Sequence, residues 1–120
     1  MKIPRSDAGD RAFLRSVLPD DPRVSVRPMF GNDAAFVNGR VFTGLFGGQL
    51  FVRLSDADQA VLLKEKGAER FAPMKGRPMT GYVVVPEAWR ADPEKVSAWV
   101  ARSLSWVGGL PAKTSKRPRG

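Results

Sequence analysis

Residues 23–54 decide the fold, and they read RVSVRPMFGNDAAFVNGRVFTGLFGGQLFVRL. Apolar and polar residues alternate along much of this stretch, which is the pattern of β-strands with one buried face. Turn formers interrupt the pattern at Gly31-Asn32-Asp33, Asn38-Gly39 and Gly47-Gly48. Asn-Gly favours a type I′ hairpin turn, and all three connections are too short for the crossover that parallel strands need. The stretch therefore predicts a meander of four antiparallel strands.

The first strand of the meander shows two sets of alternating side chains. The apolar set is expected to face the core, and it consists of Val24, Val26 and Phe30. The other set is expected to face away from the core, and it consists of Ser25, Arg27 and Met29. A half-buried strand of this kind belongs to a sheet with a hydrophobic layer on one face, which helices commonly cover.

Helix signals lie on both sides of the meander. Ser6 or Asp7 can cap a helix over residues 7–18, because these side chains accept hydrogen bonds from the free N–H groups of a first helical turn. Ser55 can cap a second helix in the same way. This helix is predicted to end at Gly67, since glycine is favoured just beyond a helix C-terminus.

The rest of the chain adds one strand and one helix. Residues 68–78 are predicted to form a loop and residues 79–85 a fifth strand. Asp92-Pro93 is typical of a helix start and opens a helix over residues 93–107, with Trp99 expected at the centre of its buried stripe. Full burial of Trp99 implies a loss of about 3–5 kcal/mol on replacement by alanine. The order helix, four strands, helix, strand, helix predicts an α+β domain with helices covering a mostly antiparallel sheet, a four-stranded meander plus a fifth strand.

Composition excludes several classes of protein. The 120 residues are 42% apolar and 27% charged, which is typical of a single globular domain. No stretch has the length of apolar residues that a membrane-spanning helix needs, and the start of the chain lacks the apolar core of a signal peptide. We therefore expect a cytoplasmic protein with no membrane partner. The absence of cysteine and histidine excludes disulfides, thiolate metal sites, and catalysis by either residue type.

Charge is concentrated at the C-terminus. Lysine and arginine number 20 against 12 acidic residues, a formal net charge of +8. Half of this surplus lies in residues 111–120, which hold the candidate nucleic-acid-binding residues Lys113, Lys116, Arg117 and Arg119. The tail has no periodic apolar face to bury, so we expect a folded domain over residues 1–110 followed by a flexible basic tail. Contact with phosphates and a purely solubilising role both remain open for it.

No residue pattern supports a catalytic, cofactor or metal site. Gly44, Gly47 and Gly48 do not form a phosphate-binding motif and are interpreted as glycines that join strand to strand. Asp56 and Asp58 lack the remainder of a calcium loop and suit the start of a helix. Tyr82 lies in an apolar strand, so we expect it to be a packing residue. The chain is accordingly predicted not to be an enzyme and to need no cofactor.

A basic and aromatic surface is the remaining candidate site. Four phenylalanines on the meander are predicted to pack mainly in the core, namely Phe36, Phe42, Phe46 and Phe51. The residues that face away from the core are candidates for a partner-binding face, namely Arg27, Met29, Arg53, Lys75 and Arg77. The alternative is an ordinary solvated sheet edge, on which arginine stems cover apolar neighbours.

A series of short motifs gives the sequence a family resemblance. In chain order these are Arg27-Pro28-Met29-Phe30-Gly31, Val37-Asn38-Gly39, Phe42, Arg53-Leu54, Gly67 with Phe71, Gly76-Arg77-Pro78-Met79, Tyr82 with Val85-Pro86, Trp99, and Leu110-Pro111. With this ordered set the sequence resembles the TfoX N-terminal domain family over about residues 8–111. The resemblance implies a helix, a curved antiparallel sheet and further helices, in agreement with the element order predicted above.

The resemblance also implies a regulatory role. The namesake bacterial proteins, also called Sxy, regulate natural competence as coactivators with the cyclic-AMP receptor protein, and their N-terminal domain has no established catalytic residues. Those longer proteins add a second, C-terminal domain, and this sequence resembles the N-terminal domain alone. We therefore expect a non-enzymatic module that binds a protein partner. The alternative is weak electrostatic binding of nucleic acid through the basic tail and the basic sheet residues.

Overall fold

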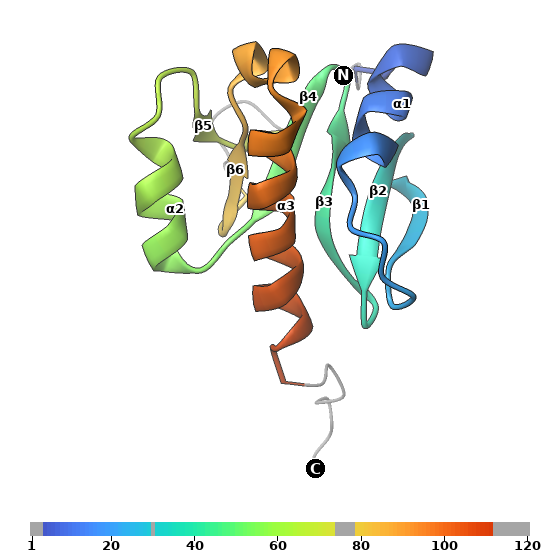
Figure 1. Cartoon of the computed structure of the whole chain (residues 1–120), viewed down its shortest axis with the longest axis vertical. Helices are drawn as coiled ribbons and strands as arrows, with labels where there is room; N and C mark the ends of the chain where they lie inside the picture. Colours follow the sequence, from blue (N-terminus) through green and yellow to red (C-terminus); the bar gives the residue numbers. More distant parts are fainter. Residues whose placement is uncertain (1–3, 30, 74–78, 112–120) are drawn as a thin grey trace.

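The computed structural model describes residues 4–29, 31–73 and 79–111. Within them the chain forms an antiparallel sheet of six strands in the order β1-β2-β3-β4-β6-β5, together with three α-helices (Figure 1). The elements are α1 (Ala8–Val17), β1 (Ser25–Met29), β2 (Asn32–Val37), β3 (Arg40–Phe46), β4 (Gln49–Arg53), α2 (Asp56–Leu63), β5 (Glu69–Arg70), β6 (Tyr82–Val84), the 3₁₀ helix η1 (Glu87–Ala91) and α3 (Pro93–Gly108). The predicted α+β fold with helices over an antiparallel sheet is confirmed.

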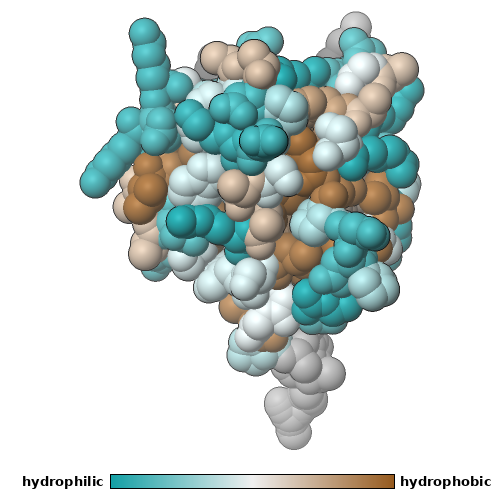
Figure 2. Space-filling view, viewed as in Figure 1, coloured by the Kyte–Doolittle hydropathy of each residue, from teal (hydrophilic) through white to brown (hydrophobic). Residues whose placement is uncertain are grey.

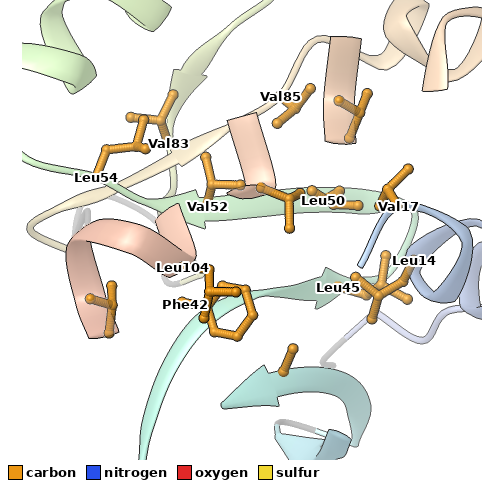
Figure 3. Packing of buried hydrophobic residues seen from close by; sticks show 14 of the residues in the cluster. Leu14, Val17, Phe42, Leu45, Leu50, Val52, Leu54, Val83, Val85 and Leu104 are labelled. Carbon is orange, nitrogen blue, oxygen red and sulfur yellow. The ribbon is translucent and has the colours of Figure 1, made fainter. Parts of the chain in front are cut away.

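All three α-helices pack on one side of the sheet, which we call the helix-covered face. In the foreground of Figure 1, α3 runs along the middle of the sheet, with α1 and α2 on either side. The main core lies between these helices and the strands: Leu104 of α3 lies against Phe42 of β3, and Leu14 of α1 lies near Leu45 of the same strand (Figure 3). On this side of the molecule, hydrophobic residues reach the surface between α3 and α1, with hydrophilic residues around them (Figure 2).

The predicted meander is confirmed by its turns and strand pairing. Asn38 and Gly39 have positive φ angles of 53° and 78°, as a type I′ turn requires, and Gly47 has a φ of 63°. Strands β1 to β4 pair with their neighbours in the chain, all antiparallel. Val26 pairs with the core residue Ala35, so the apolar set of β1 faces the helices as predicted, whereas Phe30 lies outside the described residues.

Helix starts follow the capping residues, but one helix end differs from the prediction. Asp7 forms a full capping box with Asp10, the Ser55 side chain accepts from the N–H of Asp58, and Asp92 caps α3. The second helix ends at Leu63 and not at Gly67. The chain between them continues as turns, in which the N–H of Glu65 donates to Leu62 and that of Ala68 donates to Glu65.

The segment around the fifth predicted strand is also different. Residues 68–78 were predicted to be a loop, yet Glu69 and Arg70 form the edge strand β5. The strand predicted over residues 79–85 is shortened to Tyr82–Val84, because the N–H of Tyr82 donates to Met79 in a turn. Strand β6 lies between β4 and β5, so it is an interior strand of the sheet.

A β-bulge in β3 brings the longest helix into register with the sheet. Ala35 pairs with Thr43 and Phe36 with Val41, which leaves Phe42 without a partner in β2. The buried hydroxyl of Ser103 donates to the Phe42 carbonyl at 2.6 Å. A polar group of α3 thus donates to a buried backbone acceptor at the position of the bulge.

The expected full burial of Trp99 is wrong. The residues of α3 that face the sheet are Val96, Val100, Ser103, Leu104 and Val107, and Trp99 lies at the margin of this stripe, only partly buried. The Arg102 guanidinium lies 4.8 Å from the centre of its ring. Replacement of Trp99 by alanine therefore removes less buried surface than a central position implies.

In the described part of the chain, no helix combines the length and hydropathy needed to cross a membrane.

Candidate functional site

The side of the sheet opposite the α-helices, which we call the helix-free face, carries a second hydrophobic cluster. Its buried members are Phe46, Phe51, Phe71, Tyr82 and Val84. Phe71 stacks on Phe51 at a centroid distance of 4.5 Å and meets Phe46 edge-on at 5.4 Å. The meander phenylalanines are thus divided between the two faces, since Phe42 belongs to the main core. The prediction of a hydrophobic layer on only one face of the sheet was therefore incomplete.

Gly44 makes the close packing of this cluster possible. It lies inside β3, so the prediction that it joins two strands is wrong, whereas Gly47 and Gly48 do connect β3 to β4. A Cβ atom at Gly44 would lie 2.8 Å from Cζ of Phe51 and 2.9 Å from Cβ of Ala34. The ring of Phe51 therefore occupies the space in which any other residue at position 44 would place its side chain.

Three of the predicted partner-binding residues share the helix-free face. Arg27 and Met29 lie on the edge strand β1, with Arg27 exposed and Met29 packed against the second cluster. Arg53 lies at the end of β4, opposite Tyr82 of β6. The other two predicted residues, Lys75 and Arg77, are outside the described residues. The same holds for the tail candidates, which are Lys113, Lys116, Arg117 and Arg119.

Aromatic rings hold the two arginines in place. The Arg27 guanidinium carbon lies 4.2 Å from the centre of the Phe36 ring. That of Arg53 lies 5.8 Å from the Tyr82 ring and 5.7 Å from the Trp106 ring. A guanidinium group attracted to an aromatic face retains N–H groups that can donate to an anion. Both arginines are therefore positioned as anion-binding groups.

A groove of about 570 Å³ opens beside Arg53. It is lined by Phe36, Gly39, Arg40, Val41, Arg53, Tyr82 and Leu110. No carboxylate is among the described residues that line it. Arg40 and Leu110 were not among the predicted site residues, because they lie 70 positions apart in the sequence and only the fold brings them together. The Asn38-Gly39 turn was the signal that could have placed Arg40 opposite Val37 at the start of β3.

Tyr82 forms part of the wall of this groove, and the pKa of its hydroxyl is shifted. Burial of the hydroxyl raises its pKa above the ordinary value of 10.0, and the nearby positive charge of Arg53 offsets part of that rise. Tyr82 is therefore neutral at physiological pH and contributes a ring and a hydroxyl, as its predicted packing role implies.

A second hollow, of about 300 Å³, lies at the opposite end of β4 and includes Arg90. The Arg90 guanidinium donates to Oδ1 of Asp10 at 2.6 Å and to the Gly48 carbonyl at 3.2 Å. Burial alone raises the pKa of Asp10, but hydrogen bonds from Asp7 and Arg90 hold it below the ordinary value of 3.8. Arg90 thus connects η1, α1 and the β3–β4 turn, which is a structural role.

Acidic clusters give no metal site in the described residues, where no three carboxylates lie close enough together to bind an ion. Four arginines do pair with carboxylates, and none of them lines the groove: Arg15, Arg23, Arg90 and Arg102. Arg27, Arg40 and Arg53 have no such partner among the described residues. In the part of the chain that the structure describes, the groove beside Arg53 therefore combines arginines that have no carboxylate partner with a concave apolar surface.

Comparison with known proteins connects most of the chain to a protein family. The family model of the TfoX N-terminal domain matches residues 17–106, which is most of the chain. No curated protein and no solved structure matches the chain. The matched range begins at the last residue of α1 and ends within α3, so it includes every strand of the sheet.

Proposed function

The chain belongs to the TfoX N-terminal domain family, and from this membership we propose that it is a non-enzymatic regulatory module that acts by binding a protein partner. The observation that carries the proposal is the groove beside Arg53, with apolar walls and with arginines that have no carboxylate partner among the described residues. Binding surfaces of this kind combine aromatic and arginine side chains with a concave apolar centre.

The position of the face supports this role. All three α-helices pack on the opposite side of the sheet, and among the described residues that line the groove only Leu110, just beyond the end of α3, comes from that side's helical layer. Arg27 is exposed, and Arg40 and Arg53 are half-buried, which leaves guanidinium groups within reach of another molecule. Binding of a partner here therefore requires no rearrangement of the hydrophobic core.

Direct nucleic-acid binding is the alternative. Proteins that bind single strands offer exposed aromatic rings on which bases stack. Here the rings of Phe46, Phe51 and Phe71 are buried against one another, and Arg27 lies over Phe36. These contacts favour the protein partner on this face and restrict the alternative to electrostatic contact with phosphates.

The proposal is tested by affinity capture from native cells, with and without nuclease treatment. We expect at least one protein to be retained after nuclease treatment by the parent chain and lost with the Arg27→Gln, Arg53→Gln double variant. The Arg11→Gln variant is the matched control, because Arg11 is an exposed arginine of α1 on the other side of the sheet. Release of every captured protein by nuclease favours the nucleic-acid alternative and contradicts the proposal.

A further inference from the structure

The groove beside Arg53 carries charge of one sign among its described lining residues. Arg40 and Arg53 line it, and Arg27 lies over Phe36, which forms part of its wall. No described residue that lines the groove is acidic. An occupant that excludes water from these guanidinium groups must supply negative charge, because a desolvated cation without a partner is costly.

The arginines around the groove are arranged before any partner binds. Arg53 lies between the rings of Tyr82 and Trp106, and Arg27 lies over Phe36. Nη2 of Arg40 donates to the Pro111 carbonyl at 2.6 Å, which orients its guanidinium and leaves its remaining N–H groups for other acceptors. Side chains fixed in this way lose less conformational entropy on binding. Their planar N–H pairs match the two oxygens of a carboxylate.

The walls of the groove are apolar between these charges. Phe36, Val41, Tyr82 and Leu110 contribute rings and aliphatic groups to it. Such walls suit an apolar side chain, and the cations beside them suit acidic residues on either side of it. A sugar-phosphate strand has the charge but lacks the apolar side chain, and its bases find no free ring in the second cluster.

The remainder of this chain does not supply the complementary charge. Residues 112–120 contain four cations and no acidic residue, and residues 74–78 contain Lys75 and Arg77 and no acidic residue. Both segments lie outside the described residues and are basic by sequence, so neither complements the groove. An acidic occupant of the groove would therefore come from a second molecule.

We infer that the groove binds an acidic segment of a partner protein, in which carboxylates pair with Arg27, Arg40 and Arg53 while an apolar side chain between them enters the space beside Phe36 and Val41. This inference rests on the proposed function and adds the chemistry of the partner. Carboxylates and one apolar anchor thus define the class of sequence that the domain recognises.

The test measures the binding of short fluorescein-labelled probes by fluorescence anisotropy at low salt. The first probe is a peptide in which glutamates flank one leucine, the second has glutamine at each glutamate position, and the third is a single-stranded oligonucleotide of similar length. We expect the glutamate peptide to bind at least about tenfold more tightly than the glutamine peptide, and more tightly than the oligonucleotide.

Matched variants locate the binding site. Arg53→Gln and Arg40→Gln are each expected to weaken binding of the glutamate peptide by about fivefold or more, and Arg11→Gln by less than about twofold, although all three remove one positive charge. Heteronuclear NMR spectra verify that each variant is folded. Since Arg40 lies outside both hydrophobic clusters, Arg40→Gln serves as the test if Arg53→Gln disturbs the fold.

Two results contradict the inference. One is equal binding of the glutamate and glutamine peptides, or equal effects of the Arg11, Arg40 and Arg53 substitutions. The other is tighter binding of the oligonucleotide through the same arginines, which assigns the groove to nucleic acid. Failure of the inference can be told apart from failure of the proposed function. A protein partner that resists nuclease and requires Arg53, but does not compete with the glutamate peptide, contradicts the inference and leaves the proposed function intact.

Discussion

At the scale of single residues, two positions on the helix-free face control its shape. Gly44 lets the ring of Phe51 lie against β3, and Phe51 in turn stacks on Phe71. Tyr82 joins this aromatic cluster to Arg53 and to the groove. The helix-free face therefore depends on the absence of a side chain at Gly44 and on the buried Tyr82 with its hydroxyl.

Replacement of Gly44 by alanine is expected to lower the free energy of unfolding by about 1–3 kcal/mol, because the new Cβ overlaps the Phe51 ring and Ala34. Urea unfolding measures the change. Gly48→Ala is the control, since the nearest atom to its Cβ, Oδ1 of Asp10, is 3.8 Å away, and we expect a change within about 0.5 kcal/mol. Equal stability of Gly44→Ala and the parent contradicts the packing of Phe51 described above.

Titration of Tyr82 can be followed without interference, because it is the only tyrosine. The absorbance of tyrosinate is expected to give a pKa above 10.0 in the folded protein and a value near 10 after unfolding in urea. A pKa that is higher in the folded state favours the unfolded chain at high pH, so stability is retained below the unfolded pKa and falls as the pH rises above it.

Arg53→Gln extends this prediction. The positive charge of Arg53 favours the tyrosinate form, so its removal is expected to raise the pKa of Tyr82 further. The same absorbance titration measures the shift, with Arg11→Gln as the control of equal charge. A pKa of Tyr82 that is unchanged or lower in Arg53→Gln shows that the two side chains do not interact in solution.

At the scale of secondary structure, one buried polar contact joins α3 to β3. The hydroxyl of Ser103 donates to the carbonyl of Phe42, at the position of the bulge in β3. The end of α3, with Trp106, lies close to Arg53. The packing of α3 on the sheet thus also places a ring beside an arginine of the groove.

Ser103→Ala is expected to lower the free energy of unfolding by about 1–3 kcal/mol, because the buried Phe42 carbonyl loses its donor. Urea unfolding measures the effect, and Ser105→Ala, an exposed position on the same helix, is expected to change stability by less than about 0.5 kcal/mol. Similar effects of the two substitutions contradict the assigned role of Ser103.

At the scale of the whole molecule, one ion pair joins parts of the chain that are far apart in sequence. Asp10 of α1 accepts from Arg90 of η1, and Arg90 also donates to Gly48 in the β3–β4 turn. Oδ2 of Asp10 also accepts from the N–H of Asp7, which is part of the capping box of α1. This carboxylate therefore combines a local and a long-range interaction, in an end of the molecule remote from the groove.

Asp10→Asn is expected to lower the free energy of unfolding by about 1–3 kcal/mol at neutral pH, since it removes the charge from both interactions. The pKa of Asp10 is lower in the folded state than its ordinary 3.8, so its stabilising effect is present above that value and disappears as the pH falls through the folded pKa. The difference between parent and variant should accordingly shrink in acid. Asp20→Asn, at an exposed loop position, is the control in urea unfolding across pH.

Local interactions explain what the sequence by itself determined about this protein. The helix starts at Asp7, Ser55 and Asp92 and the Asn38-Gly39 turn each depend on contacts within about four residues, so they could be predicted from the residues present. The meander follows from these turns, because such short connections permit antiparallel pairing only. The alternation along β1 also placed Arg27 and Met29 together on one face.

Only the tertiary structure decided the remaining features, since each depends on residues distant in the chain. The pairing of β5 with β6, the partial burial of Trp99 and the bulge at Phe42 reflect how the helices and strands pack, which no local pattern specifies. The groove forms because Arg40 follows a hairpin turn while Leu110 follows α3, and folding brings them to one place. Charge and hydrophobicity are properties of the sequence, but a concave site exists only when long-range packing has fixed the positions of its walls.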